Sequence, residues 1–176
     1  MKVSKMSVTR CLDELEVAKI DVAIKQGRTR CFVWKGSYEK LFQAALPFMR
    51  TPLYKEINPA LKSKEIAKCR AGGISALSQY SMITDHNHMT YAVSKKEAKM
   101  LEISNMSKMP KGEVPEAVVQ VMQYILPYGK KGVIDPLSIA LALQEESRYD
   151  VRIEKEVEKM LKRFSNNISR ILMTTI

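Results

Sequence analysis

The sequence predicts an α+β fold in two parts: a helix-and-hairpin region at about residues 1–50, then a lobe mixing helices and short strands over residues 60–176. Three observations predict it. Apolar residues recur every three or four positions near both ends of the chain, which is the period of an amphipathic helix. Alternating or β-branched runs between these segments are typical of strands. Prolines at positions 52 and 59 favour a connection between the two parts over residues 50–59.

The first predicted element is a helix over residues 4–19, for which Ser4 and Ser7 are candidate N-caps. Its apolar residues form one stripe that we expect to face inward: Val8, Cys11, Leu12 and Leu15. The outward face is short and polar and is basic at its N-terminal end, where Arg10 projects.

A β-hairpin follows, because the apolar period changes from about 3.6 to two at residue 20. Residues 20–25 alternate as a half-buried strand, Gln26 and Gly27 supply the turn, and residues 28–34 form a second, aromatic-rich strand. Three cations surround the tip of this hairpin: Lys25, Arg28 and Arg30. Residues 37–46 then predict a short helix that ends near Pro47.

The second part begins with a predicted helix over residues 62–82, interrupted at Gly72 and Gly73. A strand over residues 90–93 leads into the capping box of residues 94–97, which starts a helix through about Ile103. Residues 118–126 are interpreted as a strand, although a helical period also fits them.

Two further helices have clear start signals. Asp135 followed by Pro136 is an N-cap with proline at the first helical position. Asp150 caps a charged amphipathic helix whose apolar stripe comprises Ile153, Val157, Met160, Leu161, Phe164 and Ile168.

The positive charge is concentrated toward the N-terminus. The chain has a net charge of +10, and residues 1–70 hold 15 Lys/Arg against 7 Asp/Glu. Such an excess attracts polyanions, and nucleic acid is the commonest of these in a cell. A basic surface that serves only solubility is the alternative.

A helix followed by a basic hairpin suits DNA binding, because a helix fits the major groove while hairpin cations meet phosphates or the minor groove. A helix packed on a hairpin with a solvated basic tip is the alternative interpretation. The segment from Met6 to Glu16, continued by Ile20-Asp21-Val22 and Gln26-Gly27-Arg28, resembles the recognition helix and wing of MarR-like winged-helix transcriptional regulators. The resemblance implies groove-facing side chains on the helix, namely Ser4, Lys5, Ser7, Thr9 and Arg10, with Arg28 and Arg30 on the wing.

A winged-helix domain normally has two helices before its recognition helix, and this chain offers about three residues there. We therefore expect either a shortened form of a longer protein, or burial of the Leu12 stripe by a helix of the second lobe or of a second copy. The second possibility predicts a homodimer on double-stranded DNA. Later segments such as residues 71–77 resemble those of bacterial winged-helix regulators with a C-terminal lobe, and that lobe is similar, more weakly, to abortive-infection-type winged-helix antitoxins. The alternative function is therefore an antitoxin-like module that neutralises a partner protein and regulates its own operon.

Other function classes have little support in the sequence. His86 and His88 supply two candidate metal ligands without a third, and the three cysteines lack metal-site spacing, so we expect no metal, no cofactor and reduced thiols. No nucleophile, base and metal set converges, and we expect no enzyme activity. No apolar run approaches the roughly 18 residues of a membrane helix and no secretion signal is evident, which predicts a cytoplasmic protein without membrane contact.

Overall fold

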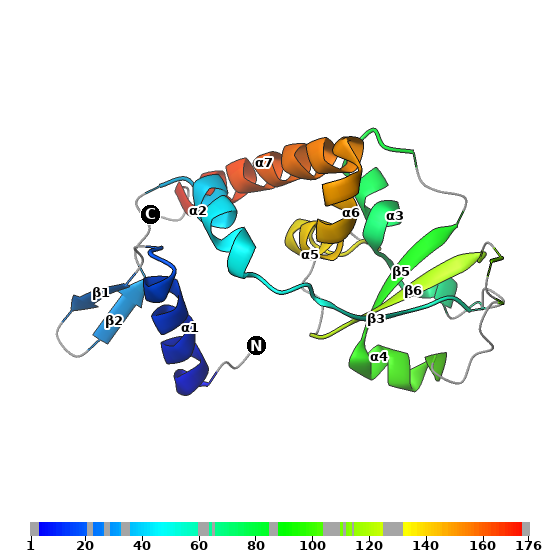
Figure 1. Ribbon diagram of the computed structural model, residues 1–176, viewed down its shortest axis with the longest axis horizontal. Coiled ribbons are helices and arrows are strands. Elements are labelled where there is room, and N and C mark those ends of the chain that lie inside the picture. The colour runs from blue at the N-terminus through cyan, green and yellow to red at the C-terminus, as the bar shows by residue number, and fades with distance from the viewer. Residues whose placement is uncertain are drawn as a thin grey trace. The chain divides into compact units, whose positions relative to one another are not determined.

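The structure is a computed structural model, and Figure 1 shows its helices and strands. It describes residues 4–20, 23–26, 29–32, 36–59, 64, 66–84, 88–103, 110, 112–113, 115–124 and 132–173. The chain divides into two compact units. Unit 1 comprises Met1–Met49 and Ser165–Ile176, and unit 2 comprises Arg50–Phe164. The predicted α+β class is confirmed by helices and a four-stranded mixed sheet.

Unit 1 begins with helix α1, Lys5–Val17. Ser4 caps it, because the Ser4 side chain accepts a hydrogen bond from the Ser7 backbone N–H at 3.1 Å. After the helix, Lys19 adopts a left-handed backbone conformation with φ 56°, which turns the chain toward the hairpin. Strand β1, Ala23–Gln26, pairs antiparallel with β2, Thr29–Phe32, so the predicted hairpin is confirmed.

Helix α2, Tyr38–Ala45, and the 3-10 turn η1, Leu46–Phe48, complete the first stretch of unit 1. A small apolar cluster holds this unit together. It joins the end of α1 to α2 and consists of Ile20, Ala45, Leu15, Ala18 and Leu41. Burial of these side chains favours the docking of α2 against the end of α1.

The apolar stripe of α1 is only partly buried, which corrects the prediction. Leu12 is buried and Leu15 is half-buried, whereas Val8 is 47% exposed and Cys11 is exposed. The difference arises because the apolar cluster of unit 1 packs against the C-terminal half of the helix, around Leu15 and Ala18. The N-terminal half therefore presents both polar and apolar side chains at the surface.

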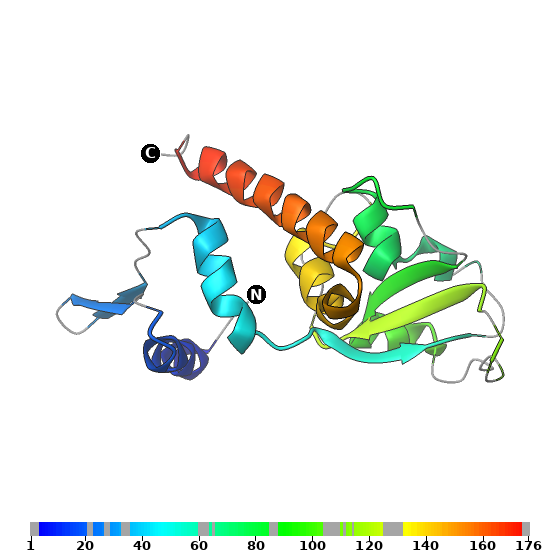
Figure 2. The ribbon, with the colours of Figure 1, turned by 45° about the horizontal axis from the view of Figure 1, so that its top comes forward.

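Unit 2 is built on a sheet with the strand order β3-β6-β5-β4. Its strands are β3, Leu53–Ile57; β4, Arg70–Ala71; β5, Met89–Ser94; and β6, Ala117–Met122. The central strands β5 and β6 run parallel, and the outer strands pair antiparallel with them (Figure 2). Both central strands were predicted as strands, and the structure confirms them. Beyond β4, Ala71 forms a parallel bridge with Val133.

Helices cover both faces of this sheet. Helix α4, Lys95–Met100, lies on one side, over a core that includes Tyr91, Val93, Val119 and Val121. Helices α3, Gly73–Ser78, and α5, Pro136–Ala142, lie on the other side (Figure 1). Parallel strands with both faces covered are typically apolar throughout, and every residue of β6 is buried.

Local start signals determine the remaining helices. The predicted capping box is present, with Ser94 and Glu97 bonding each other's backbone N–H groups at 3.2 and 2.7 Å. Asp135 caps α5 as expected, accepting from the Ser138 N–H at 3.0 Å. Helix α6, Gln144–Tyr149, precedes α7, Val151–Met173, whose residues Ile153, Val157 and Met160 are buried as predicted.

Two predictions about unit 2 are wrong. Residues 62–82 do not form one interrupted helix: among the described residues, the 3-10 turn η2, Ile66–Lys68, is followed by β4 and then α3. A side chain at Gly72 would place its Cβ 2.8 Å from the Ala92 Cβ, so glycine allows the chain to lie against β5. Residues 50–59 were expected to be a connection, but they contain the edge strand β3.

Candidate nucleic-acid interface

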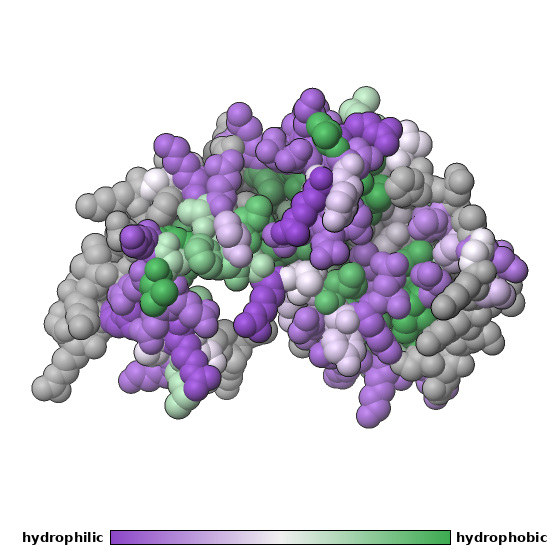
Figure 3. All heavy atoms as spheres, viewed as in Figure 1, coloured by the Kyte–Doolittle hydropathy of each residue, from purple (hydrophilic) through white to green (hydrophobic). Residues whose placement is uncertain are grey.

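The N-terminal half of α1 carries five predicted site residues, each of them exposed: Ser4, Lys5, Ser7, Thr9 and Arg10. The side chains of Ser4 and Ser7 share a hydrogen bond of 2.8 Å, and the Thr9 hydroxyl donates to the Lys5 carbonyl at 3.1 Å. Within the described part of the chain, neither Lys5 nor Arg10 takes part in an ion pair. In Figure 3 the side chains of α1 facing the viewer are mostly hydrophilic.

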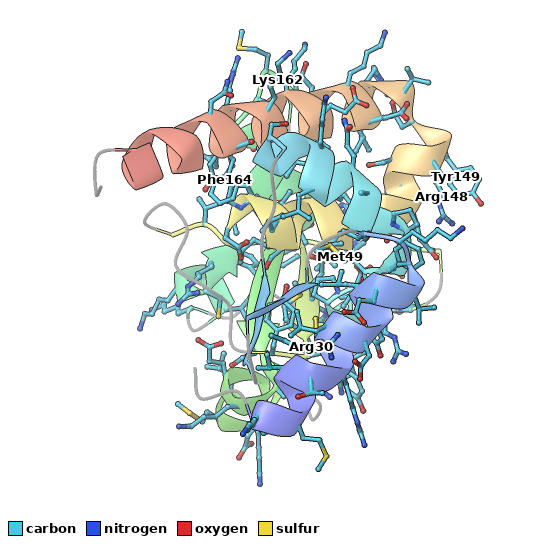
Figure 4. The ribbon with its side chains drawn as sticks, turned by 90° about the vertical axis from the view of Figure 1, so that its left-hand side faces the viewer. Arg30, Met49, Arg148, Tyr149, Lys162 and Phe164 are labelled. Atoms are coloured by element: carbon cyan, nitrogen blue, oxygen red, sulfur yellow. The ribbon has the colours of Figure 1, made fainter. Side chains whose placement is uncertain are left out.

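The C-terminal half of α1 is acidic and holds the hairpin. Arg30 of β2 donates from Nη1 to Asp13 Oδ1, and its Nη2 lies 2.8 Å from Glu16 Oε1. Figure 4 shows Arg30 beside α1. Hydrogen bonds with Asp13 and Glu16 raise the pKa of Arg30 above its ordinary value. Two carboxylates thus balance the charge of this guanidinium, and the pairs fix the hairpin against the helix.

The hairpin residues predicted for the site have different positions. Arg30 pairs with α1, although it was expected at the cationic tip. Lys25 is the cross-strand partner of Arg30 in the hairpin ladder. Arg28 lies outside the described residues. The structure therefore shows the five α1 residues exposed around the N-terminal half of the helix and gives Arg30 a contact with α1, while the role of all these residues toward DNA stays a prediction.

Asp13 and Glu16, which engage Arg30, were not among the residues that the sequence predicted for the site. They lie three positions apart, which places both carboxylates on one side of the helix, within reach of one guanidinium. That spacing was the available signal. Which cation would meet them depends on how the hairpin folds back onto α1, and a helical period contains no information about that.

Unit 2 has a half-open hollow of about 320 Å³ beneath α4. It is lined by two cations, one carboxylate and otherwise mainly apolar groups: Lys68, Cys69, Arg70, Ala92, Val93, Glu97, Met100 and Leu101. Glu97 is committed to the α4 cap. Burial, followed by the negative charge of Glu97, raises the pKa of the Cys69 thiol, which favours the protonated thiol over the reactive thiolate.

The described residues contain neither a group of metal ligands nor a helix that could span a membrane. No three of their His, Cys, Asp or Glu side chains are grouped so that they could hold a metal ion. His86 lies outside the described ranges, so the histidine pair is not placed by the structure. None of the described helices is long and apolar enough to cross a bilayer.

Comparison with known proteins adds no further identification. No protein-family model, curated protein or solved structure matches this chain.

Proposed function

We propose that this protein binds double-stranded DNA through the N-terminal half of α1 and the adjoining hairpin, as a sequence-specific transcriptional regulator of partial winged-helix type. One observation carries the proposal: the charges of α1 are separated along its length. The exposed cations Lys5 and Arg10 occupy the N-terminal half, whereas the carboxylates of Asp13 and Glu16 are engaged by Arg30. The half that carries the cations thus keeps them available for a polyanion.

This order of charges along α1 does not stabilise the helix itself. A helix is positive at its N-terminus and negative at its C-terminus, so a cation in the first turn and carboxylates in the last are each unfavourable by about 0.3–1 kcal/mol when exposed. Helix α1 has no acidic residue in its first turn and no basic residue in its last. An anion placed near the first turn removes part of this cost, because it meets both the Lys5 ammonium and the positive helix end.

The sizes of the exposed side chains also suit a groove. Ser7 and Thr9 are short, which lets the helix backbone approach base edges closely. Arg10 is long enough to reach the O6 and N7 atoms of a guanine, and its planar guanidinium matches that pair of acceptors. Lys25 and Arg28 of the hairpin would contact phosphates beside the helix.

The test is a comparison of Arg10→Ala and Lys5→Ala with Lys40→Ala, which removes an exposed charge from α2 of the same unit. Duplexes selected from a random library are titrated in fluorescence anisotropy at several salt concentrations. Each phosphate contact that a variant removes is expected to reduce the salt slope by roughly 1. A base contact by Arg10 instead costs about 1–3 kcal/mol at one position of the duplex.

Two outcomes contradict the proposal. Wild-type protein that binds no duplex excludes DNA binding altogether. Equal effects of Arg10→Ala, Lys5→Ala and Lys40→Ala would mean that binding follows net charge and not α1.

A second candidate function is supported by the exposed apolar residues of α1. Met6 is 66% exposed and Val8 47% exposed, and Cys11 also lies at the surface. Exposed apolar groups on a helix favour contact with another protein, either a second copy in a homodimer or a toxin-like partner. Analytical ultracentrifugation of wild type and Val8→Ser, each with and without the product of a neighbouring gene, distinguishes these cases. A wild-type monomer that forms no heteromeric complex would exclude both.

A further inference from the structure

Helix α4 of unit 2 displays three lysines on its outward side: Lys95, Lys96 and Lys99. Ala98, on the opposite side, is buried in the core, and Leu101 packs against the same core. All three lysines are exposed, and hydrophilic side chains project from this part of unit 2 in Figure 3. The one carboxylate of α4, on Glu97, reaches back to the Ser94 N–H at 2.7 Å and so lies at the cap. The outward side of α4 therefore contains no acidic residue.

Two of these lysines do not stabilise their own helix, whereas Lys99, in the last turn, suits its negative end. Lys95 and Lys96 occupy the first turn, where the helix end is already positive. Lys95 and Lys99 are four positions apart, which places like charges side by side. Lys95 is further held in place, because its Nζ lies 3.8 Å from the centre of the Tyr54 ring. Three exposed cations on one side of α4, two of them at its positive end, suit an anionic ligand outside the helix.

We propose that the outward lysines of α4 form a second, sequence-independent contact surface for the phosphate backbone of duplex DNA. Compact ammonium groups on flexible stems suit phosphates, because they supply charge without requiring a fixed geometry. This inference rests on the proposed DNA binding, and it adds unit 2 to the contact with nucleic acid. Base recognition remains with α1, and α4 adds affinity for any sequence.

The test compares two double variants of the full chain that remove the same charge. Lys96→Gln/Lys99→Gln changes α4 and spares the Lys95–Tyr54 contact, whereas Lys155→Gln/Lys162→Gln changes two exposed lysines of α7. The probe is a duplex of unrelated sequence and about 30 base pairs, which spans several helical turns. Binding is followed by anisotropy between about 50 and 200 mM salt. Circular dichroism confirms that both variants are folded.

We expect the α4 variant to lower the salt slope by roughly 0.9 for each phosphate that it no longer neutralises, and to weaken binding several-fold, with no change in the preference between duplex sequences. The α7 variant should match wild type.

Equal losses of affinity in the two variants, or no loss in either, would overturn the inference while leaving binding through α1 intact. A loss of sequence preference in the α4 variant would also overturn it. Failure of the wild type to bind any duplex removes both proposals. If the α4 variant still binds DNA but no longer binds a protein partner, this surface is assigned to an acidic protein and not to DNA.

Discussion

Arg30 and Glu16 lie 2.8 Å apart, from Nη2 to Oε1, and with Asp13 they connect the hairpin to α1. We predict that Arg30→Ala loosens the hairpin, because one substitution removes both of the described ion pairs between the hairpin and the helix. Amides of β1 and β2 should exchange faster with deuterium, as measured by mass spectrometry, while amides of the unit 2 sheet keep their protection. Arg10→Ala is the control, since no described ion pair involves Arg10. Unchanged exchange over β1 and β2 in Arg30→Ala would contradict this role.

The α4 capping box predicts a defined pH dependence. Burial opposes ionisation of Glu97, but hydrogen bonds from Ser94 and the charge of Arg70 have the larger effect, so the pKa of Glu97 lies below its usual 4.5. A carboxyl group with a lowered folded-state pKa contributes stability above its ordinary pKa and loses it as the pH falls through the folded value. The stability difference between wild type and Glu97→Gln should therefore shrink as the pH is lowered below about 4.5.

Urea unfolding across a pH series measures this difference. Ser94→Ala should cost about 0.5–2 kcal/mol at neutral pH, because it removes the side-chain half of the cap. Ser37→Ala is the matched comparison, since Ser37 accepts from the Lys40 N–H in the same manner at the start of α2. A Glu97→Gln difference that stays constant down to about pH 3 would show that Glu97 does not act through its charge.

Gly72 is predicted to resist replacement by a residue with a side chain. An added Cβ would lie 2.8 Å from the Ala92 Cβ and 3.1 Å from the Ala92 nitrogen, so part of the clash is with backbone that cannot easily move. Gly72→Ala should destabilise the protein by about 1–3 kcal/mol in chemical denaturation, as overpacking does. Adding Ala92→Gly removes the closer clash and should restore part of the stability. A Gly72→Ala protein as stable as wild type would show that β5 can yield at this point.

The cysteines are predicted to differ in reactivity. Cys11 is exposed on α1, whereas Cys69 is half-buried and its pKa is raised by burial and by Glu97. Because the thiolate is the reacting species, iodoacetamide at neutral pH should label Cys11 before Cys69. Peptide mass spectrometry over time measures both rates in a Cys31→Ser background. Faster labelling of Cys69 would contradict the burial of its side chain.

Elements with local signals were predictable from the sequence, and those that depend on distant partners were not. The caps at Ser94 and Asp135 involve residues three positions apart, so a short segment contains all the information needed. Strand β3 has three exposed residues in its centre and a bulge after Leu53, and it is a strand because it pairs with β6, which lies far along the chain at Ala117–Met122. Residues 70–71 likewise form a strand through contact with β5.

The candidate site shows the same division. The helical period predicted the exposed position of Arg10, because exposure follows from the angle around α1. The same period wrongly placed Val8 and Cys11 inward, since burial also requires a neighbour, and the apolar cluster of unit 1 packs against the other half of the helix. The contact of Arg30 with Asp13 and Glu16 required the folded hairpin. The separation of charges along α1 was visible in the sequence, but the cation that pairs with its carboxylates was not.

Helix α7 has a consequence for the order in which this protein is assembled. Its residues up to Phe164 belong to unit 2, whereas those from Ser165 onward belong to unit 1 together with Met1–Met49. During synthesis, the ribosome makes all of unit 2 before it makes the second portion of unit 1. The first 49 residues are therefore made well before Ser165–Ile176, the segment that completes their unit. A chain truncated just before Ser165 would therefore contain every strand of the four-stranded sheet but would lack the second portion of the unit proposed to bind DNA.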